Sequence, residues 1–221
     1  MIEIAVMVEP RVHQYLKPVI DNMLRNLNDD IPIQIFHSSL NENFLKQNYQ
    51  KLIDEKKIIL SLLENIKNLT INQYNLLLTS KKFWNRIEKE HILIFQTDSC
   101  LCRHINTFDF TPYLDYGFIG APCHREPWQN GGLSIRKKSL MLEAINKNKQ
   151  SVRYNEDKFF SLIYKDICKP APFALGNAFS VEQHYNDNPL GIHKPWLYLS
   201  KENWTNLKNN FPEIGLTFNN L

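Results

Sequence analysis

Polar residues follow a very apolar stretch near the middle of the chain, and they are the first candidates for chemistry. Asp98 comes just after four large apolar residues, 92–95, in the run Gln96-Thr97-Asp98-Ser99. A carboxylate at the end of a strand can bind a divalent cation that bridges two phosphates, because hard cations take oxygen ligands. An Asp that caps a turn or the following helix explains the same pattern.

A second group of candidates lies in the run Asn130-Gly131-Gly132, which precedes a short apolar stretch. Adjacent glycines allow positive φ angles and let another group approach the backbone closely. A plain hairpin turn accounts for the same residues. Neither G-x-x-x-x-G-K nor G-x-G-x-x-G occurs in the chain, so these glycines are not a phosphate loop of the Walker or dinucleotide type.

Two adjacent carboxylates form the third group. Asn155-Glu156-Asp157 is expected to begin a helix, with Asn155 as its N-cap. The helix dipole stabilises acidic residues at this position without any function. Alternatively, one of the carboxylates is a general base that faces an acceptor hydroxyl.

The fourth group lies near the C-terminus, where His193-Lys194 follows Gly191 and precedes Pro195-Trp196. An imidazole can ligate a metal, and a lysine can offset the charge of a phosphate. A lone histidine is also a common structural or surface residue.

These groups need a scaffold, and the first half of the chain predicts one. Apolar runs predict strands and helical spacing predicts helices, in the alternating order strand 2–8, helix 16–27, strand 31–36, helix 44–53, strand 57–62, two short helices within 72–90, and strand 92–95. This alternation predicts a parallel sheet with crossover helices. Such sheets bind nucleotides at the carboxyl ends of their strands.

The second half continues as the same α/β domain. It predicts strands at 117–122 and 133–136 and helices at 138–148, at 155–165 and from 201 onward. No internal repeat, low-complexity block or linker interrupts the chain, so we expect a single domain over 1–221.

Composition and charge exclude several classes of protein. Lys and Arg number 26 against 23 Asp and Glu, a net charge of +3, which is too weak for a nucleic-acid partner. The cysteines do not match zinc spacings, and we expect reduced thiols. The run 1–10 lacks the features of a signal peptide, and no run approaches the roughly 20 apolar residues that span a bilayer. We therefore expect a cytoplasmic protein without a membrane anchor.

Six short motifs occur in one order along the chain: Ile94-Phe95-Gln96-Thr97-Asp98-Ser99, Phe118-Ile119-Gly120-Ala121-Pro122, Asn130-Gly131-Gly132-Leu133-Ser134-Ile135-Arg136, Asn155-Glu156-Asp157, Phe179-Ser180-Val181-Glu182 and Gly191-Ile192-His193-Lys194-Pro195-Trp196. This combination resembles a family of glycosyltransferase-like proteins, long catalogued as a domain of unknown function, that belongs with the GT-A nucleotide-sugar transferases. The resemblance implies a Rossmann-like GT-A fold with a mostly parallel central sheet flanked by helices. It also implies a nucleotide-binding half, 1–95, and a metal, acceptor and catalytic half, 96–221.

The resemblance implies a metal site. Asp98 resembles the last carboxylate of a D-x-D motif, which holds Mn²⁺ or Mg²⁺ on the nucleotide diphosphate. His193 is similar to the C-terminal histidine that completes this site in many such enzymes. The run 193–196 also resembles the H-x-x-G-x-x-K-P-W ending of glycogenin-like transferases, although here His directly precedes Lys. Gln96 stands at the first position of D-x-D, so the metal has fewer protein carboxylates.

The resemblance also implies the other roles. Asp157, or Glu156, resembles the E-D pair that supplies the base in fringe-like inverting transferases. Residues expected at the nucleotide and donor sugar are Val8, Glu9, Arg11, Gln96, Thr97, Asp98, Gly131, Gly132 and Lys194. Trp128 and Asn130 are expected at the acceptor, with Trp128 on a lip formed by the loop 123–129.

The implied function is the transfer of a sugar from a nucleotide-diphosphate donor, UDP-linked, to a hydroxyl of a glycan or protein. A carboxylate base favours inversion, whereas the ending at 193–196 is similar to that of retaining enzymes, so both outcomes stay open. Two other classes also stay open: a non-catalytic sugar-nucleotide or glycan-binding module on the same fold, and a metal-dependent hydrolase or nucleotidyltransferase that uses Asp98 and His193.

Overall fold

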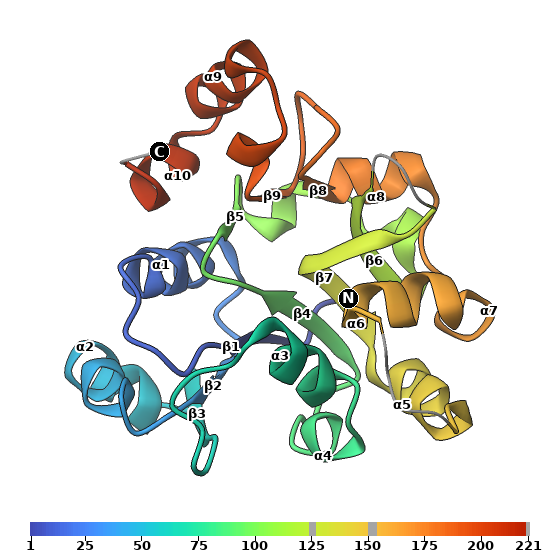
Figure 1. The fold of residues 1–221 in the computed structure, drawn as a ribbon. Coiled ribbons are helices and arrows are strands. Elements are labelled where there is room, and N and C mark those ends of the chain that lie inside the picture. Colours follow the sequence, from blue (N-terminus) through green and yellow to red (C-terminus); the bar gives the residue numbers. More distant parts are fainter. Residues whose placement is uncertain (124–126, 150–153, 220–221) are drawn as a thin grey trace.

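The apolar runs form the strands of a sheet that lies between two layers of helices (Figure 1). The computed structural model describes residues 1–123, 127–149 and 154–219. Its strands are β1 (Ile4–Val8), β2 (Ile33–His37), β3 (Ile58–Leu62), β4 (His91–Phe95), β5 (Ser99–Leu101), β6 (Phe118–Pro122), β7 (Gln129–Lys137), β8 (Ser180–Val181) and β9 (Gly191–His193). Its helices are α1 (Leu16–Asn26), α2 (Glu42–Asp54), α3 (Ile71–Leu78), α4 (Lys81–Trp84), α5 (Lys138–Lys147), α6 (Glu156–Lys158), α7 (Lys165–Cys168), α8 (Phe173–Phe179), α9 (Lys201–Asn210) and α10 (Pro212–Thr217).

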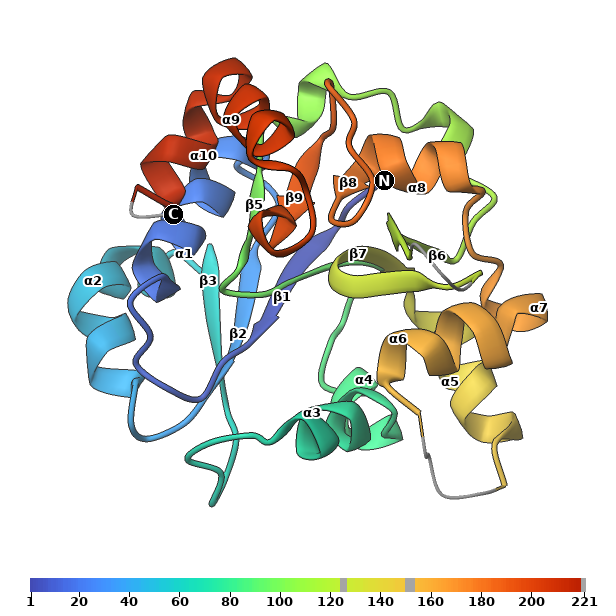
Figure 2. The same cartoon turned by 45° about the horizontal axis from the view of Figure 1, so that its top comes forward.

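The central sheet is mostly parallel, as expected. Its order is β3-β2-β1-β4-β7-β6. The first four strands run parallel, while β7 pairs antiparallel with β4 and β6 pairs antiparallel with β7. The carboxyl ends of β1 and β4 therefore lie side by side at one edge of the sheet. Figure 2 shows β1 next to its other parallel neighbour, β2.

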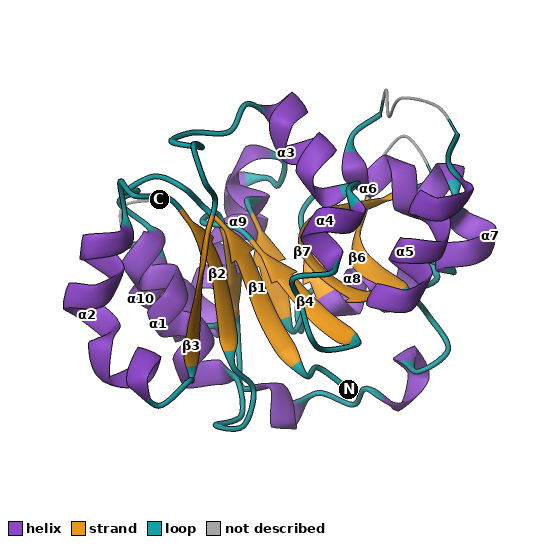
Figure 3. Cartoon of the chain, turned by 90° about the horizontal axis from the view of Figure 1, so that it is seen from below, coloured by secondary structure: helices purple, strands orange, loops and turns teal. Residues whose placement is uncertain are grey.

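Both faces of the sheet are covered, which explains why its strands are continuous apolar runs. All five residues of β1 are buried, and they alternate between two core clusters. Ala5 and Met7 pack with α1 and α2, and Val6 packs on the opposite face with residues of α4 and α5. Figure 3 shows the two helical layers on either side of the strands.

A second, small sheet brings the C-terminal segment back to the centre. Its order is β5-β9-β8, and only residues 96–98 separate the end of β4 from the start of β5. Ser99 pairs with His193, and the amide of Lys194 donates a hydrogen bond of 2.8 Å to the carbonyl of Asp98. This pairing places His193 beside Asp98, although the two are far apart in the sequence.

The strand β7 is longer than expected at its start. Phe95, the last residue of β4, pairs with Leu133, so the preceding residues of β7 extend beyond the end of β4. Gly131 and Gly132 lie inside this strand and not in a hairpin turn, and no glycine of the described chain has a positive φ angle. The expectation that these glycines provide positive φ angles is wrong.

Two further expectations need correction. The segment expected as one helix over 155–165 divides into α6, a π-helical stretch Phe159–Ile163, and α7. Asn155 occupies the N-cap position, but its side chain does not cap the helix and instead accepts a hydrogen bond from Asn75 Nδ2. The helix α8 was not expected from the sequence.

Two observations bear on the remaining expectations. Cys100, Cys102 and Cys168 are buried, and none of the three forms a disulfide. A membrane-crossing helix would have to be longer and more apolar than any helix in the described part of the chain.

A buried asparagine of α1 fixes the start of the second sheet. The side chain of Asn22 accepts a hydrogen bond of 2.8 Å from the amide of Leu101 and donates one of 2.9 Å to its carbonyl. Asn22 is fully buried, so these bonds replace water for both backbone groups of Leu101. The first helix thereby anchors β5 just past Asp98.

We therefore expect Asn22→Ala to lower the free energy of unfolding by about 2–4 kcal/mol, because two buried backbone groups lose their partners. Urea denaturation measures this loss. Asn48→Ala on the exposed face of α2 is the matched control, because the exposed Asn48 side chain donates to the carbonyl of Phe44 in its own helix, and we expect it to change stability by less than about 0.5 kcal/mol. Equal effects of the two substitutions would contradict the anchoring role.

Candidate active site

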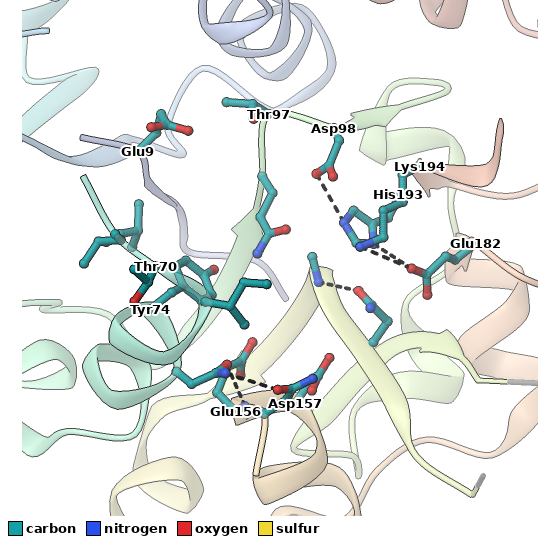
Figure 4. A pocket seen from close by; sticks show the side chains of 18 of the residues that line it. Glu9, Thr70, Tyr74, Thr97, Asp98, Glu156, Asp157, Glu182, His193 and Lys194 are labelled. Carbon is teal, nitrogen blue, oxygen red and sulfur yellow. Dashed lines mark hydrogen bonds and ion pairs between the residues drawn. The ribbon is translucent and has the colours of Figure 1, made fainter. Parts of the chain in front are cut away.

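A cleft of about 550 Å³ opens at the carboxyl edge of the central sheet. It is lined by the ends of β1 and β4, the start of β7, the N-terminal parts of α3 and α6, and residues around β9. The expected site residues that line it are Val8, Glu9, Arg11, Gln96, Thr97, Asp98, Trp128, Asn130, Gly132, Glu156, Asp157, His193 and Lys194. Of the expected residues only Gly131 is missing from this lining. Figure 4 shows the carboxylates and the imidazole around the cavity.

Asp98, His193 and Glu182 form a row along one side of the cleft (Figure 4). His193 Nε2 lies 3.2 Å from Asp98 Oδ1, and His193 Nδ1 lies 3.3 Å from Glu182 Oε1. Apart from these two contacts, the three side chains' facing atoms have no hydrogen-bond partner among the residues that the structure describes. Because a buried polar atom without a partner is unfavourable, the row is a place where another group can bind.

The electrostatics of the row favour positive charge between two carboxylates. Burial by itself lowers the pKa of His193, but the contacts with Asp98 and Glu182 outweigh it, and the pKa of His193 is raised. Burial by itself raises the pKa of Asp98, but His193 and then Lys194 outweigh it, and the pKa of Asp98 is lowered. A proton or a metal cation satisfies this demand.

Asp98 and His193 fit a divalent cation. Asp98 offers a carboxylate oxygen and His193 an imidazole nitrogen, which Mn²⁺ accepts, and Mg²⁺ accepts the oxygen. Within residues 1–123, 127–149 and 154–219, no three His, Cys, Asp or Glu side chains form a metal-binding group. The two side chains therefore fit a cation that takes its other ligands from a bound molecule.

Lys194 follows His193 in an unusual backbone conformation. Its φ of 39° lies in the left-handed region, which is uncommon for a residue with a side chain. Its ammonium group lies 3.7 Å from Glu182 Oε1, and its side chain is 25% exposed toward the cleft. The backbone turn therefore places a cation next to the row of carboxylates and the imidazole.

The acidic pair at the start of α6 divides into two different environments. Glu156 accepts two hydrogen bonds from Arg136, one from Nη1 and one of 2.9 Å from Nη2. Arg136 is fully buried, and its guanidinium lies over the ring of Phe118 at 4.8 Å from the centroid. A bidentate pair of this kind fixes the orientation of both side chains, so Glu156 is occupied by Arg136.

Asp157 has no such cation among the described residues. It lines the cleft and accepts a hydrogen bond of 2.7 Å from the amide of Lys158. Burial raises the pKa of Asp157 to about 7, and the negative charge of Glu156 adds to this effect. A carboxylate with a pKa near neutrality can accept a proton and release it again at physiological pH.

The two glycines of β7 allow the site residues to approach the backbone closely. A Cβ atom on Gly132 would collide with the imidazole of His193, and one on Gly131 would collide with Arg136 and lie 2.5 Å from Glu156 Oε1. The expected close approach is therefore present. The neighbours of Gly131 are the buried ion pair, and it is not part of the cleft lining.

At the other side of the cleft, Glu9 is held by Arg11. Glu9 is 4% exposed, and Arg11 donates to its two carboxylate oxygens at 2.9 Å from Nε and Nη2. Trp128 and Asn130 also line the cleft, and Asn130 Oδ1 accepts a hydrogen bond of 2.7 Å from the amide of Gly132. Residues 124–126 of the loop expected as an acceptor lip lie outside the described residues.

Several residues at or beneath the cleft were given no role from the sequence, among them Glu182 and Arg136. Glu182 ends the motif 179–182 and Arg136 ends the motif 130–136, so both carried a signal in their position. Their partners could not be identified because both contacts join segments that are distant in the sequence.

A family model described as "Protein of unknown function (DUF5672)" matches residues 58–193. The chain belongs to the DUF5672 family. The matched region of this DUF5672 protein includes β4, β7, the acidic pair and His193, and it excludes β1. A search of curated proteins finds no match.

Solved structures show which fold this DUF5672 member has. The glycosyltransferase GlyE of Streptococcus pneumoniae TIGR4 matches with a TM-score of 0.58 and 11% identity over 99% of this chain and 63% of GlyE. The galactosyltransferase LgtC matches with a TM-score of 0.55 and 11% identity over 94% of this chain and 96% of LgtC. The mannosyltransferase PcManGT of Pyrobaculum calidifontis was solved with GDP-Man and Mn²⁺. It matches with a TM-score of 0.53 and 14% identity over 76% of this chain and 53% of PcManGT.

The expected fold class is confirmed: the chain is a single α/β domain with the GT-A fold of these glycosyltransferases. It spans 63% of the length of the GlyE structure.

The ion pair beneath the cleft is testable at Gly131. We expect Gly131→Ala to destabilise the protein by about 1–3 kcal/mol, because the new methyl group overlaps Arg136 and Glu156. Gly215→Ala is the matched control in α10, where a Cβ meets nothing within 4 Å and the helix gains up to about 1 kcal/mol. Thermal denaturation measures both variants. A Gly131→Ala protein as stable as Gly215→Ala would contradict the close packing.

Proposed function

We propose that this protein is a glycosyltransferase that moves a sugar from a UDP-linked donor to a hydroxyl of a glycan or protein. We further propose that Mn²⁺ or Mg²⁺ assists the reaction and that the configuration at the sugar is inverted. The observation that carries the proposal is the arrangement of one cleft on a GT-A fold, with Asp98 and His193 on one side and Asp157, whose pKa is about 7, in the same lining.

The nucleoside belongs at the ends of β1 and β4 in this proposal. Ligands of open α/β sheets bind outside the carboxyl ends of the strands, and Val8, Glu9, Gln96 and Thr97 line the cleft there. The carboxylate of Glu9 accepts hydrogen bonds, and its pair with Arg11 keeps it oriented toward a base or ribose hydroxyl.

The diphosphate belongs beside Asp98, His193 and Lys194. Asp98 and His193 would hold the cation, which supplies electrostatic stabilisation to the leaving diphosphate. When the bond between sugar and phosphate breaks, negative charge builds on the diphosphate, and the ammonium group of Lys194 stabilises it at that place. Gln96, in the place of a first carboxylate, adds no negative charge near the diphosphate.

The acceptor belongs on the side of Trp128, Asn130 and Asp157. We assign the general base to Asp157, which takes the proton of the attacking hydroxyl, because burial and Glu156 raise its pKa to about 7. Glu156 keeps the start of α6 in place through Arg136. A base in this position favours inversion, since the hydroxyl attacks from the face opposite the leaving diphosphate.

We expect Asp157→Asn to lower kcat for transfer by about 10²–10⁴-fold, because the amide cannot accept the proton. In the wild-type protein, kcat/KM should rise as the pH increases through about 7, where Asp157 loses its proton. Initial rates with UDP-sugars between pH 5 and 9 measure this profile. A rate that does not change with pH in this range would contradict the assignment of the base, and so would full activity of Asp157→Asn, which would also support retention.

The same variant has a folding control. Because the folded protein holds the pKa of Asp157 above its unfolded value, ionisation of Asp157 destabilises the fold as the pH rises through about 7. Asp157→Asn should therefore raise the melting temperature at pH 8 and raise it less at pH 5. A variant that is inactive and yet more stable at pH 8 excludes misfolding as the cause of inactivity.

The proposed function is tested with a panel of nucleotide sugars and detection of released nucleoside diphosphate. We expect turnover of a UDP-sugar, slow without acceptor, and at least about 10²-fold less in Asp98→Asn and His193→Ala, because each removes a group at the developing charge. A thermal shift with UDP and Mn²⁺ but no turnover of any donor would indicate a binding module. Release of nucleoside monophosphate would indicate a hydrolase. Unchanged turnover in both variants would contradict the site.

A further inference from the structure

Among the described residues that line the cleft, Glu182 is the one carboxylate to which the proposed reaction gives no role. Its side chain is 1% exposed, and apart from its contacts with His193 and Lys194 neither carboxylate oxygen has a hydrogen-bond partner among the residues that the structure describes. A carboxylate this deeply buried is unfavourable unless a donor or a cation compensates it. Its neighbours are His193 Nδ1 at 3.3 Å and Lys194 Nζ at 3.7 Å.

The imidazole of His193 is confined on several sides. Its Nε2 faces Asp98 and its Nδ1 faces Glu182. The backbone at Gly132 lies so close to the ring that a Cβ atom there would collide with Nε2. The strand pairing of His193 with Ser99 fixes its backbone. The ring therefore presents one nitrogen to each carboxylate.

The two carboxylates differ in what else can compensate them. Asp98 is 35% exposed to the cleft, whereas Glu182 is 1% exposed. A neutral imidazole has one N–H group, and placing it at Nδ1 satisfies the more deeply buried carboxylate. The lone pair of Nε2 then faces the oxygen of Asp98. Two electron-rich atoms at 3.2 Å repel each other unless a cation lies against both.

We propose that Glu182 is a positioning residue that accepts the N–H of His193 Nδ1 and so directs the Nε2 lone pair, together with Asp98, at a divalent cation in the cleft. The inference rests on the metal-assisted function proposed above. Carboxylates that hold a ligating histidine through its second nitrogen fix the tautomer and raise the basicity of the ligand. The contact with Lys194 is longer and leaves Glu182 oriented mainly by the imidazole.

The tautomer of His193 can be read without any metal. In the ¹⁵N-histidine-labelled protein, at a pH at which the imidazole is neutral, two-bond ¹H–¹⁵N spectra should place the proton on Nδ1. His193→Gln identifies the signals by their loss. In Glu182→Ala the proton should move to Nε2, where Asp98 accepts it, and in Glu182→Gln it should stay on Nδ1, because the amide oxygen still accepts. A proton on Nε2 in the wild-type protein would overturn the inference.

The affinity for Mn²⁺ is the second readout. Electron paramagnetic resonance of free Mn²⁺, with the metal alone and with UDP, should show about 10–100-fold weaker binding in Glu182→Ala than in the wild type. Glu182→Gln should recover most of this loss, and both variants must keep the circular dichroism of the wild type. Glu213→Gln is the matched control, because Glu213 pairs with Arg25 on α1 and does not line the cleft.

The outcomes separate this inference from the proposed function. Equal Mn²⁺ affinity in wild type and Glu182→Ala, including no binding by either, overturns the role of Glu182. If the wild type then turns over a nucleotide sugar in the presence of a chelator, glycosyl transfer stands without it. If instead the tautomer and the loss of affinity are as expected and no nucleotide sugar is turned over, the positioning role stands and the proposed function fails.

Discussion

The carboxyl end of β4 is the point on which the arrangement of the site depends. At this end β4 has β1 parallel to it on one side and β7 antiparallel on the other. The turn after it is closed by Ser99, whose hydroxyl donates a hydrogen bond of 2.8 Å to the carbonyl of Gln96. Because β7 runs the opposite way, its first residues continue past the end of β4 and bring Asn130 and Gly132 to the ends of the parallel strands. One antiparallel neighbour thus adds a wall to the usual ligand position of a parallel sheet.

The charged side chains at this end of the sheet are buried. Their pairing fixes the orientation of these side chains more than it adds to the stability of the fold. Arg136 and Glu156 form a buried pair, and such pairs often contribute little net stability, because both ions lose their hydration. The pair nonetheless leaves Asp157 as the carboxylate without a cation in the described part of the site, and burial with a like charge beside it raises its pKa to about 7. In the row of Asp98, His193 and Glu182 the neighbouring charges are opposite to that of the imidazolium. The two carboxylates therefore raise the pKa of His193 by stabilising its charged form.

The predictions from the sequence succeeded where the local pattern and the tertiary environment agree. The strand β1 is buried on both faces, so its run of apolar residues was recognisable. They failed where tertiary pairing overrides local preference. Gly131 and Gly132 have the composition of a turn, yet they lie in the strand β7. The residues there are glycines because a side chain would collide with Arg136 or His193. The helix expected over 155–165 contains a π-helical stretch, and helical spacing alone does not distinguish such a stretch from a regular helix.

The sequence by itself determined the α/β class, the order of the central-sheet strands along the chain and the residue types available for chemistry, because these follow from apolar periodicity and from side-chain composition. Only the tertiary structure decided which of these residues meet. The contact of His193 with Asp98 depends on the pairing of β5 with β9, and the separation of Glu156 from Asp157 in role depends on where Arg136 is buried. Distances between remote segments follow from strand register, and pKa values follow from burial and neighbouring charge. Neither quantity is contained in the local pattern of residues.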